Sequence, residues 1–154
     1  MPLYFAYGSN MDAARLTERL AREGHTLACR RRGTAAGYRL VFNKRSSLEA
    51  HVGYANIEVC PGAVVEGTLN EIDETGLALL DRIELVPVHY ERTTISVFDW
   101  GCRQPIDAFA YLAQPAMLDA GVKPTRDYVA HLLGGADLLP EAYVRSLLNL
   151  DCSR

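Results

Sequence analysis

The sequence of 154 residues lacks any long hydrophobic run. Its apolar stretches fall well short of the roughly 20 residues that a membrane-spanning helix needs. The first residues, Met1–Tyr4, enter a strand-like segment and carry neither the basic region nor the apolar core of a signal peptide. We therefore expect a cytoplasmic protein without a membrane partner.

Metal-binding and redox motifs are also missing. No Cys-x-x-Cys pair occurs, because the four cysteines lie far apart: Cys29, Cys60, Cys102 and Cys152. The four histidines are dispersed without metal-ligand spacing: His25, His51, His89 and His131. The common zinc and thiol redox centres are thereby excluded. We expect free thiols, no metal and no other cofactor.

Positive charge is not in excess, since 16 Lys and Arg face 19 Asp and Glu, for a net charge of -3. Proteins that bind a phosphate backbone carry a basic footprint instead. The one basic run, Arg30–Arg32, lies between apolar stretches, where a solvated strand end is the expected structure. We therefore expect no nucleic-acid partner.

Repeats, low-complexity tracts and linkers are absent as well, and 49% of the residues are hydrophobic. A chain of this length buries about two-thirds of its unfolded surface, enough for one core. We therefore expect one domain over residues 1–154. The sequence leaves the oligomeric state open, a homodimer included.

Short runs rich in β-branched and aromatic residues predict seven strands, over residues 3–7, 27–31, 37–43, 51–59, 63–71, 89–98 and 106–112. Helical periodicity predicts helices over residues 11–22, 74–84 and 124–133, and a fourth from residue 140. Ser9 or Asn10 is expected to cap the first helix, and Asp73 the second. The fourth helix is expected to turn four residues inward: Tyr143, Val144, Leu147 and Leu148. This pattern favours an α+β fold with a curled or closed sheet.

The segment Tyr4–Met11 runs from an apolar strand through Gly-Ser-Asn directly into a helix. Gly8 allows close approach of the backbone to a ligand, and the N–H groups of such a turn attract a carboxylate or an oxyanion. Ser9 lacks the Gly-x-Ser-x-Gly frame of a nucleophile. Taken alone, the segment is also a common structural turn and helix cap.

Glu84 follows Leu77 and Leu80 at helical spacing, which places a carboxylate on the buried stripe of a helix. In one interpretation the helix ends at Ile83, and Glu84 faces solvent or pairs with Arg82 or Arg92. In the other, Glu84 is partly desolvated, and its raised pKa suits it to exchange a proton near neutral pH.

These segments together resemble the γ-glutamyl cyclotransferase-like (AIG2-like) family: a Tyr-Gly-Ser-Asn loop, an Asp-x-x-Glu helix end and then a Tyr-bearing strand. The resemblance covers nearly the whole chain and implies a small, mixed, mostly antiparallel β-barrel flanked by helices. It also implies that Tyr7, Gly8, Ser9 and Asn10 bind a γ-glutamyl group and that Glu84 is the acid/base.

Two tyrosines, Tyr90 and Tyr128, match family positions that hold the substrate, although an isolated tyrosine more often packs in a core. The sequence departs from the family where Gly often follows the glutamate, because here Leu85–His89 stands before Tyr90. The implied activity is cyclisation of a γ-glutamyl amide to 5-oxoproline, without a metal or cofactor. The alternatives are a carboxylate-binding module without activity and a small partner-binding protein on the same fold.

Overall fold

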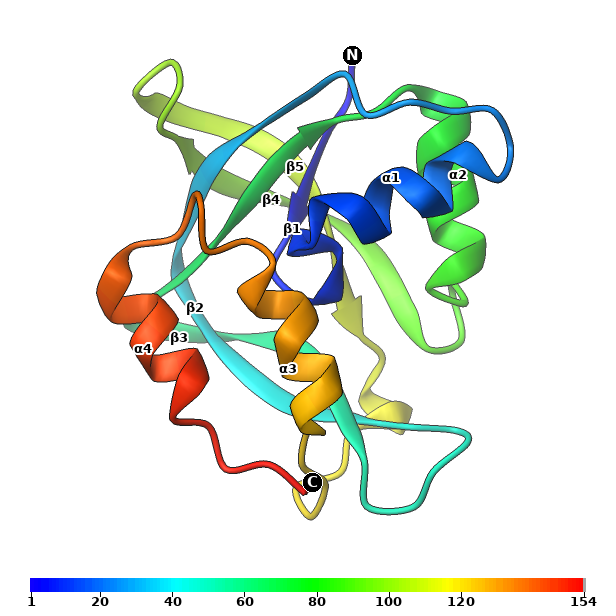
Figure 1. Cartoon of the computed structure of the whole chain (residues 1–154), viewed down its shortest axis with the longest axis vertical. Helices are drawn as coiled ribbons and strands as arrows, with labels where there is room; N and C mark the ends of the chain where they lie inside the picture. Colours follow the sequence, from blue (N-terminus) through cyan, green and yellow to red (C-terminus); the bar gives the residue numbers. More distant parts are fainter. Residues whose placement is uncertain (154) are drawn as a thin grey trace.

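A closed five-stranded barrel forms the centre of the computed structural model, which describes residues 1–153 (Figure 1). The strands are β1 (Leu3–Ala6), β2 (Cys29–Arg45), β3 (Gly53–Glu71), β4 (Tyr90–Asp99) and β5 (Gln104–Ala113). Their order around the barrel is β1-β3-β2-β4-β5. The contact between β1 and β5 is parallel and the other pairings are antiparallel. The predicted mixed, mostly antiparallel barrel is therefore confirmed.

The prediction of seven short strands is wrong, because two pairs of them are continuous. The segments predicted over residues 27–31 and 37–43 belong to β2, and those over 51–59 and 63–71 belong to β3. Gly37 and Gly62 adopt the left-handed backbone, with φ of 83° and 88°. The register shifts between Ala36 and Tyr38, and pairing then resumes. The two glycines thus lie at an irregularity in the pairing of β2 with β3, and not in turns between separate strands as the sequence suggests.

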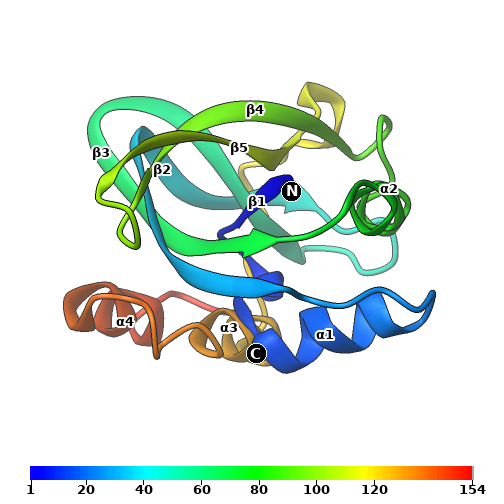
Figure 2. The same cartoon turned by 90° about the horizontal axis from the view of Figure 1, so that it is seen from above.

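The helices are α1 (Ala13–Ala21), α2 (Glu74–Ile83), α3 (Arg126–Leu133) and α4 (Glu141–Leu148), with short 3-10 turns at Ser9–Met11 and Pro115–Met117. Figure 2 shows α1, α3 and α4 along one side of the barrel, and α2 beside the far end of α1. None of the helices described is long and apolar enough to cross a membrane.

Helix α1 begins later than predicted, and its cap is not Ser9 or Asn10. Those two residues belong to the preceding 3-10 turn, so Asp12 becomes the cap and accepts a hydrogen bond from the Arg15 N–H at 3.2 Å. The predicted cap of α2 is confirmed, since Asp73 accepts from the Gly76 N–H at 2.7 Å. Leu148 on α4 was expected inside but is exposed.

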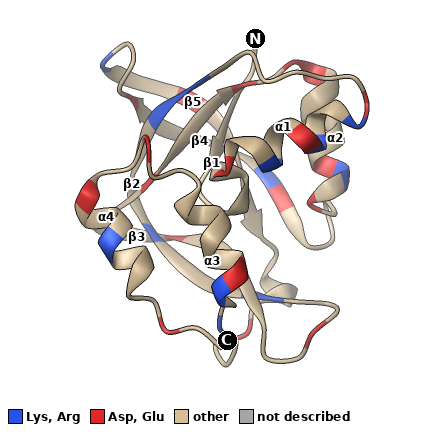
Figure 3. Ribbon diagram, viewed as in Figure 1, with Lys and Arg blue, Asp and Glu red and all other residues tan. Residues whose placement is uncertain are grey.

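The arginines of the basic run lie at the start of β2, as predicted for a strand end, but their side chains are only partly exposed because they form ion pairs. Arg30 pairs with Asp137 at 2.7 Å and Arg31 with the buried Asp99 at 2.8 Å. The third, Arg32, lies 3.4 Å from a Glu66 carboxylate oxygen. Each arginine thus meets a carboxylate from another element, and acidic and basic residues are interspersed along the chain (Figure 3).

Two hydrophobic clusters hold the barrel and its helices together. Inside the barrel, residues such as Phe5 and Leu69 are fully buried. Outside it, Leu16 of α1 and Leu77 and Leu80 of α2 share a second cluster. Because the two helices share this core, α2 is held beside the C-terminal end of α1, where Arg82 pairs with Glu23 at 2.6 Å.

Gly67 of β3 is required where β1 crosses close to it. A Cβ atom at this position would lie 2.3 Å from the Ala6 carbonyl oxygen and 2.8 Å from the Phe5 ring. We expect Gly67→Ala to lower the free energy of unfolding by about 1–3 kcal/mol, as overpacking does. Urea denaturation measures this loss. Val64→Ala, at an exposed position of the same strand, is the control, and equal effects of the two changes would contradict the close approach.

Candidate active site

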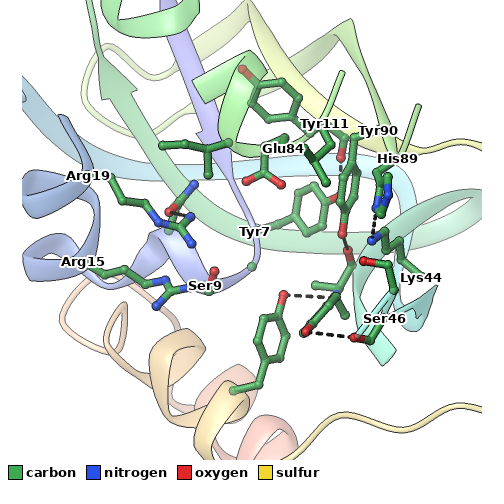
Figure 4. Close-up of a pocket in the computed structure, with 18 of the residues that line it drawn as sticks. Tyr7, Ser9, Arg15, Arg19, Lys44, Ser46, Glu84, His89, Tyr90 and Tyr111 are labelled. Atoms are coloured by element: carbon green, nitrogen blue, oxygen red, sulfur yellow. Dashed lines mark hydrogen bonds between the residues drawn. The ribbon is translucent and has the colours of Figure 1, made fainter. Parts of the chain in front are cut away.

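A pocket of about 400 Å³ opens at one end of the barrel, between the loop after β1, the end of α2 and α3 (Figure 4). All seven residues singled out in the sequence line it: Tyr7, Gly8, Ser9, Asn10, Glu84, Tyr90 and Tyr128. The fold therefore brings together segments that are far apart in the sequence. The roles of these residues stay predictions.

The loop after β1 turns the backbone into the pocket. Its two turn hydrogen bonds run from the Met11 N–H to the Gly8 carbonyl at 3.0 Å and from the Asp12 N–H to the Ser9 carbonyl at 3.2 Å. The N–H groups of Ser9 and Asn10 take no part in these two bonds, as expected at the start of a turn. A Cβ atom on Gly8 would lie 3.2 Å from the Tyr128 hydroxyl. The glycine thus lets the loop approach that hydroxyl closely.

The Asn10 side chain connects β1 to α1. It is buried, donates through Nδ2 to the Tyr4 hydroxyl at 3.0 Å, and accepts through Oδ1 from the Arg19 guanidinium at 2.9 Å. The family resemblance assigns Asn10 to substrate binding. In this structure its side chain orients Arg19, which also lines the pocket.

Glu84 is the C-cap of α2, directly after Ile83, and it faces the pocket in Figure 4. The alternative partners are occupied elsewhere, because Arg82 pairs with Glu23 at 2.6 Å and Arg92 lies 3.5 Å from Asp81. Within residues 1–153, the Glu84 carboxylate forms no ion pair and no hydrogen bond. The structure thus favours the interpretation of Glu84 as a pocket carboxylate.

Burial raises the pKa of Glu84 above its ordinary value of 4.5, while Arg19, Lys44 and Arg15 partly oppose the shift. The negative end of the α2 dipole also disfavours a carboxylate at this cap. Three cations therefore surround Glu84 without neutralising it in a direct pair. A raised pKa makes the ionised carboxylate a stronger base than an ordinary glutamate.

Two tyrosine hydroxyls hold the backbone of Ala55 on β3. Tyr90 donates to the Ala55 carbonyl at 2.9 Å, and Tyr128 accepts from the Ala55 N–H at 3.1 Å. Burial raises the pKa of both phenols, so they stay neutral. The Tyr128 proton remains available to a ligand, whereas the Tyr90 oxygen can still accept. Tyr7 donates instead to the carbonyl of Tyr111.

Several pocket residues were not found from the sequence. Arg15 and Arg19 lie one turn apart on α1, and their spacing directly after the loop is a signal that could have identified them. Lys44 of β2 and His89 also line the pocket, with Lys44 Nζ 2.6 Å from His89 Nδ1. That contact joins two residues 45 positions apart in the sequence, so no local sequence pattern predicts it.

Leu85 explains the departure from the family pattern after Glu84. Its φ is 55°, in the left-handed region that glycine adopts without strain. A leucine thus occupies a backbone conformation that favours glycine. Its side chain is 51% exposed and lines the pocket.

Comparison with solved structures identifies the fold as that of the γ-glutamyl cyclotransferases. A structure titled γ-glutamyl cyclotransferase matches with a TM-score of 0.84 and 23% identity, over 99% of this chain and 89% of the other. An uncharacterized human protein matches with a TM-score of 0.82 and 25% identity, over 98% and 88% of the two chains. A yeast γ-glutamyl cyclotransferase specific to glutathione matches with a TM-score of 0.62 and 11% identity, over 96% and 93%.

The sequence shows which family the chain belongs to. Residues 4–130 match the family model described as γ-glutamyl cyclotransferase, AIG2-like. The chain belongs to this family. No protein of curated function matches the sequence.

The bond between Tyr128 and Ala55 predicts a structural cost for removing this hydroxyl. In Tyr128→Phe, the buried Ala55 N–H loses its partner, and we expect the free energy of unfolding to fall by about 1–3 kcal/mol. Urea denaturation is the measurement. Tyr54→Phe serves as the control, because the Tyr54 hydroxyl makes only a 3.4 Å contact with Ser46. Equal losses in the two variants would show that Tyr128 does not support the pocket wall.

Proposed function

We propose that the protein is a γ-glutamyl cyclotransferase that converts a γ-glutamyl amide to 5-oxoproline and releases an amine or amino acid. The observation that carries this proposal is Glu84, a carboxylate that has no ion pair within residues 1–153 and lies in a pocket that also contains the Gly8–Asn10 loop. Family membership supports it, since the match spans both segments.

The reaction needs no enzyme nucleophile, because the substrate carries its own. Its α-amino nitrogen attacks the γ-carbonyl carbon and closes a five-membered ring, a step that is favoured when the chain is held folded. Glu84 first accepts a proton from the α-ammonium group. In this proposal the N–H groups of Ser9 and Asn10, which line the same pocket, stabilise the oxyanion that forms.

Collapse of this intermediate breaks the bond between the γ-carbon and the leaving nitrogen. Glu84 delivers its proton to that nitrogen and so returns to the carboxylate form. The regenerated Glu84 carboxylate then accepts the second proton from the ring nitrogen and passes it to the released amine, so the attacking ammonium loses two protons and the leaving nitrogen gains two to become an ammonium ion. The products are 5-oxoproline and this ammonium, and the enzyme is unchanged.

Replacing the proposed base tests the function. Glu84→Gln keeps the shape of the side chain but cannot accept the proton, so we expect 5-oxoproline formation to fall by about 10²- to 10⁴-fold. Mass spectrometry of 5-oxoproline measures the rate, and isothermal titration checks that a γ-glutamyl ligand still binds.

The matched control is Glu91→Gln, at an exposed glutamate on β4, which should retain the wild-type rate. A folded Glu84→Gln protein that binds the ligand and still cyclises it at the wild-type rate would refute the proposed mechanism. Binding without turnover in the wild-type protein would favour the carboxylate-binding alternative.

The raised pKa of Glu84 predicts the acid side of the pH profile. Because the ionised form is the base, activity is lost when the pH falls through the pKa of this carboxyl in the free enzyme. We expect the acid limb of kcat/KM to have its midpoint above 4.5, the ordinary glutamate value. Circular dichroism at each pH separates this effect from unfolding. A midpoint at or below 4.5 in a folded protein would contradict a raised pKa of Glu84.

A further inference from the structure

Lys44 is a buried cation on the pocket wall across from the arginines. It lies near the end of β2, and only 4% of its surface is exposed. In Figure 4, Arg15 and Arg19 lie on one side of Glu84, and Lys44 lies with His89 on the other. Within residues 1–153, Lys44 forms no ion pair. A buried ammonium without an anion is costly, which indicates a use for this charge.

The Lys44 ammonium is held in place by neutral groups. Its Nζ lies 2.6 Å from His89 Nδ1 and within 5.5 Å of the ring centres of Tyr54 and Tyr90. Burial and the neighbouring cations Lys44 and Arg45 lower the pKa of His89, so the neutral ring accepts this bond. The backbone of His89 is fixed on both sides, by Leu85 and by Gln114. An ammonium has three donors, so two remain after the bond to His89.

The charges lining the pocket do not balance. Arg15, Arg19 and Lys44 are positive, and Glu84 is the one carboxylate among the lining residues described. A γ-glutamyl group brings one α-carboxylate and one α-ammonium, and is therefore neutral overall. The surplus of positive charge favours a substrate with a second carboxylate.

We propose that Lys44 binds a carboxylate of the leaving group, so that the preferred substrates are γ-glutamyl amino acids and not γ-glutamyl derivatives of simple amines. This inference rests on the proposed function, in which the γ-glutamyl group lies against the Gly8–Asn10 loop near Arg15 and Arg19. With the scissile bond at Glu84, the leaving amine then extends toward Lys44. The α-carboxylate of an amino acid is only two bonds from the leaving nitrogen.

The mouth of the pocket on this side carries apolar side chains. Leu48 is 90% exposed and Leu85 is 51% exposed, and both line the pocket. An apolar side chain on the leaving amino acid would cover part of this surface. Leucine is therefore a suitable leaving group for the test.

The test compares two substrates that differ in one group. γ-Glutamyl-leucine has the carboxylate, and γ-glutamyl-isopentylamide is the same molecule without it. We expect wild-type kcat/KM to be about 10- to 100-fold higher for γ-glutamyl-leucine, the usual effect of a hydrogen bond to a charged group. This comparison needs no variant and thus holds whether or not a Lys44 variant folds.

Variants then assign the preference to Lys44. In Lys44→Met the ratio of the two kcat/KM values should fall to near one, whereas Lys44→Arg keeps a cation and should restore part of it. Lys123→Met is the matched control at the chain's other lysine, which is half-exposed and pairs with Asp151 at 2.7 Å. That variant should keep the wild-type ratio.

The outcomes separate this inference from the proposed function. If the wild-type protein forms 5-oxoproline from both substrates with a ratio near one, the protein is a cyclotransferase and the role of Lys44 is refuted. A large ratio that survives in a folded Lys44→Met protein also refutes it. If neither substrate, nor any other γ-glutamyl compound, yields 5-oxoproline, the proposed function fails and the inference fails with it.

Discussion

The rest of the site depends on the Glu84 carboxylate, which has no ion pair within residues 1–153. It has none because α2 ends one residue earlier and because the neighbouring arginines have other partners, Glu23 for Arg82 and Asp81 for Arg92. Burial of Leu77 and Leu80 fixes the rotation of α2, and so determines that the cap residue faces the pocket. A carboxylate kept out of ion pairs by packing is suited to proton transfer, since its charge is not already neutralised.

The barrel contributes by bringing distant segments to one end. Strand β1 delivers the Gly8–Asn10 loop, β3 delivers Ala55 between two tyrosine hydroxyls, and β2 delivers Lys44. The hydroxyls of Tyr90 and Tyr128 bond to the Ala55 backbone, and the Tyr7 hydroxyl bonds to the Tyr111 carbonyl. Charged groups are thereby left to face the cavity, three positive and one negative among the lining residues described. The pocket thus combines uncharged phenols with charged side chains from α1, β2 and the end of α2.

Local sequence patterns predicted the features that depend on neighbouring residues in the chain. The cap of α2 at Asp73 and the stripe of Leu77, Leu80 and Glu84 follow from side-chain spacing, and both appear in the structure. The long-range pairing of strands could not be predicted from local patterns. Gly37 and Gly62 are typical turn residues, but they lie within the continuous strands β2 and β3. The contact of Lys44 with His89 and the ion pairs of Arg30–Arg32 likewise depend on the closed barrel. The family resemblance supplied the overall fold, but not the cations that surround Glu84.

Incubation of the wild-type protein with a panel of γ-glutamyl amino acids and γ-glutamyl amines, followed by mass spectrometry of the products, shows whether the protein cyclises a γ-glutamyl group. The account predicts that at least one compound yields 5-oxoproline together with an equal amount of the released amine. Release of glutamate in place of 5-oxoproline would show that water, and not the substrate's own amino group, attacks the γ-carbonyl. Binding of panel compounds without any product would contradict the assignment of Glu84 as the acid/base of an enzyme.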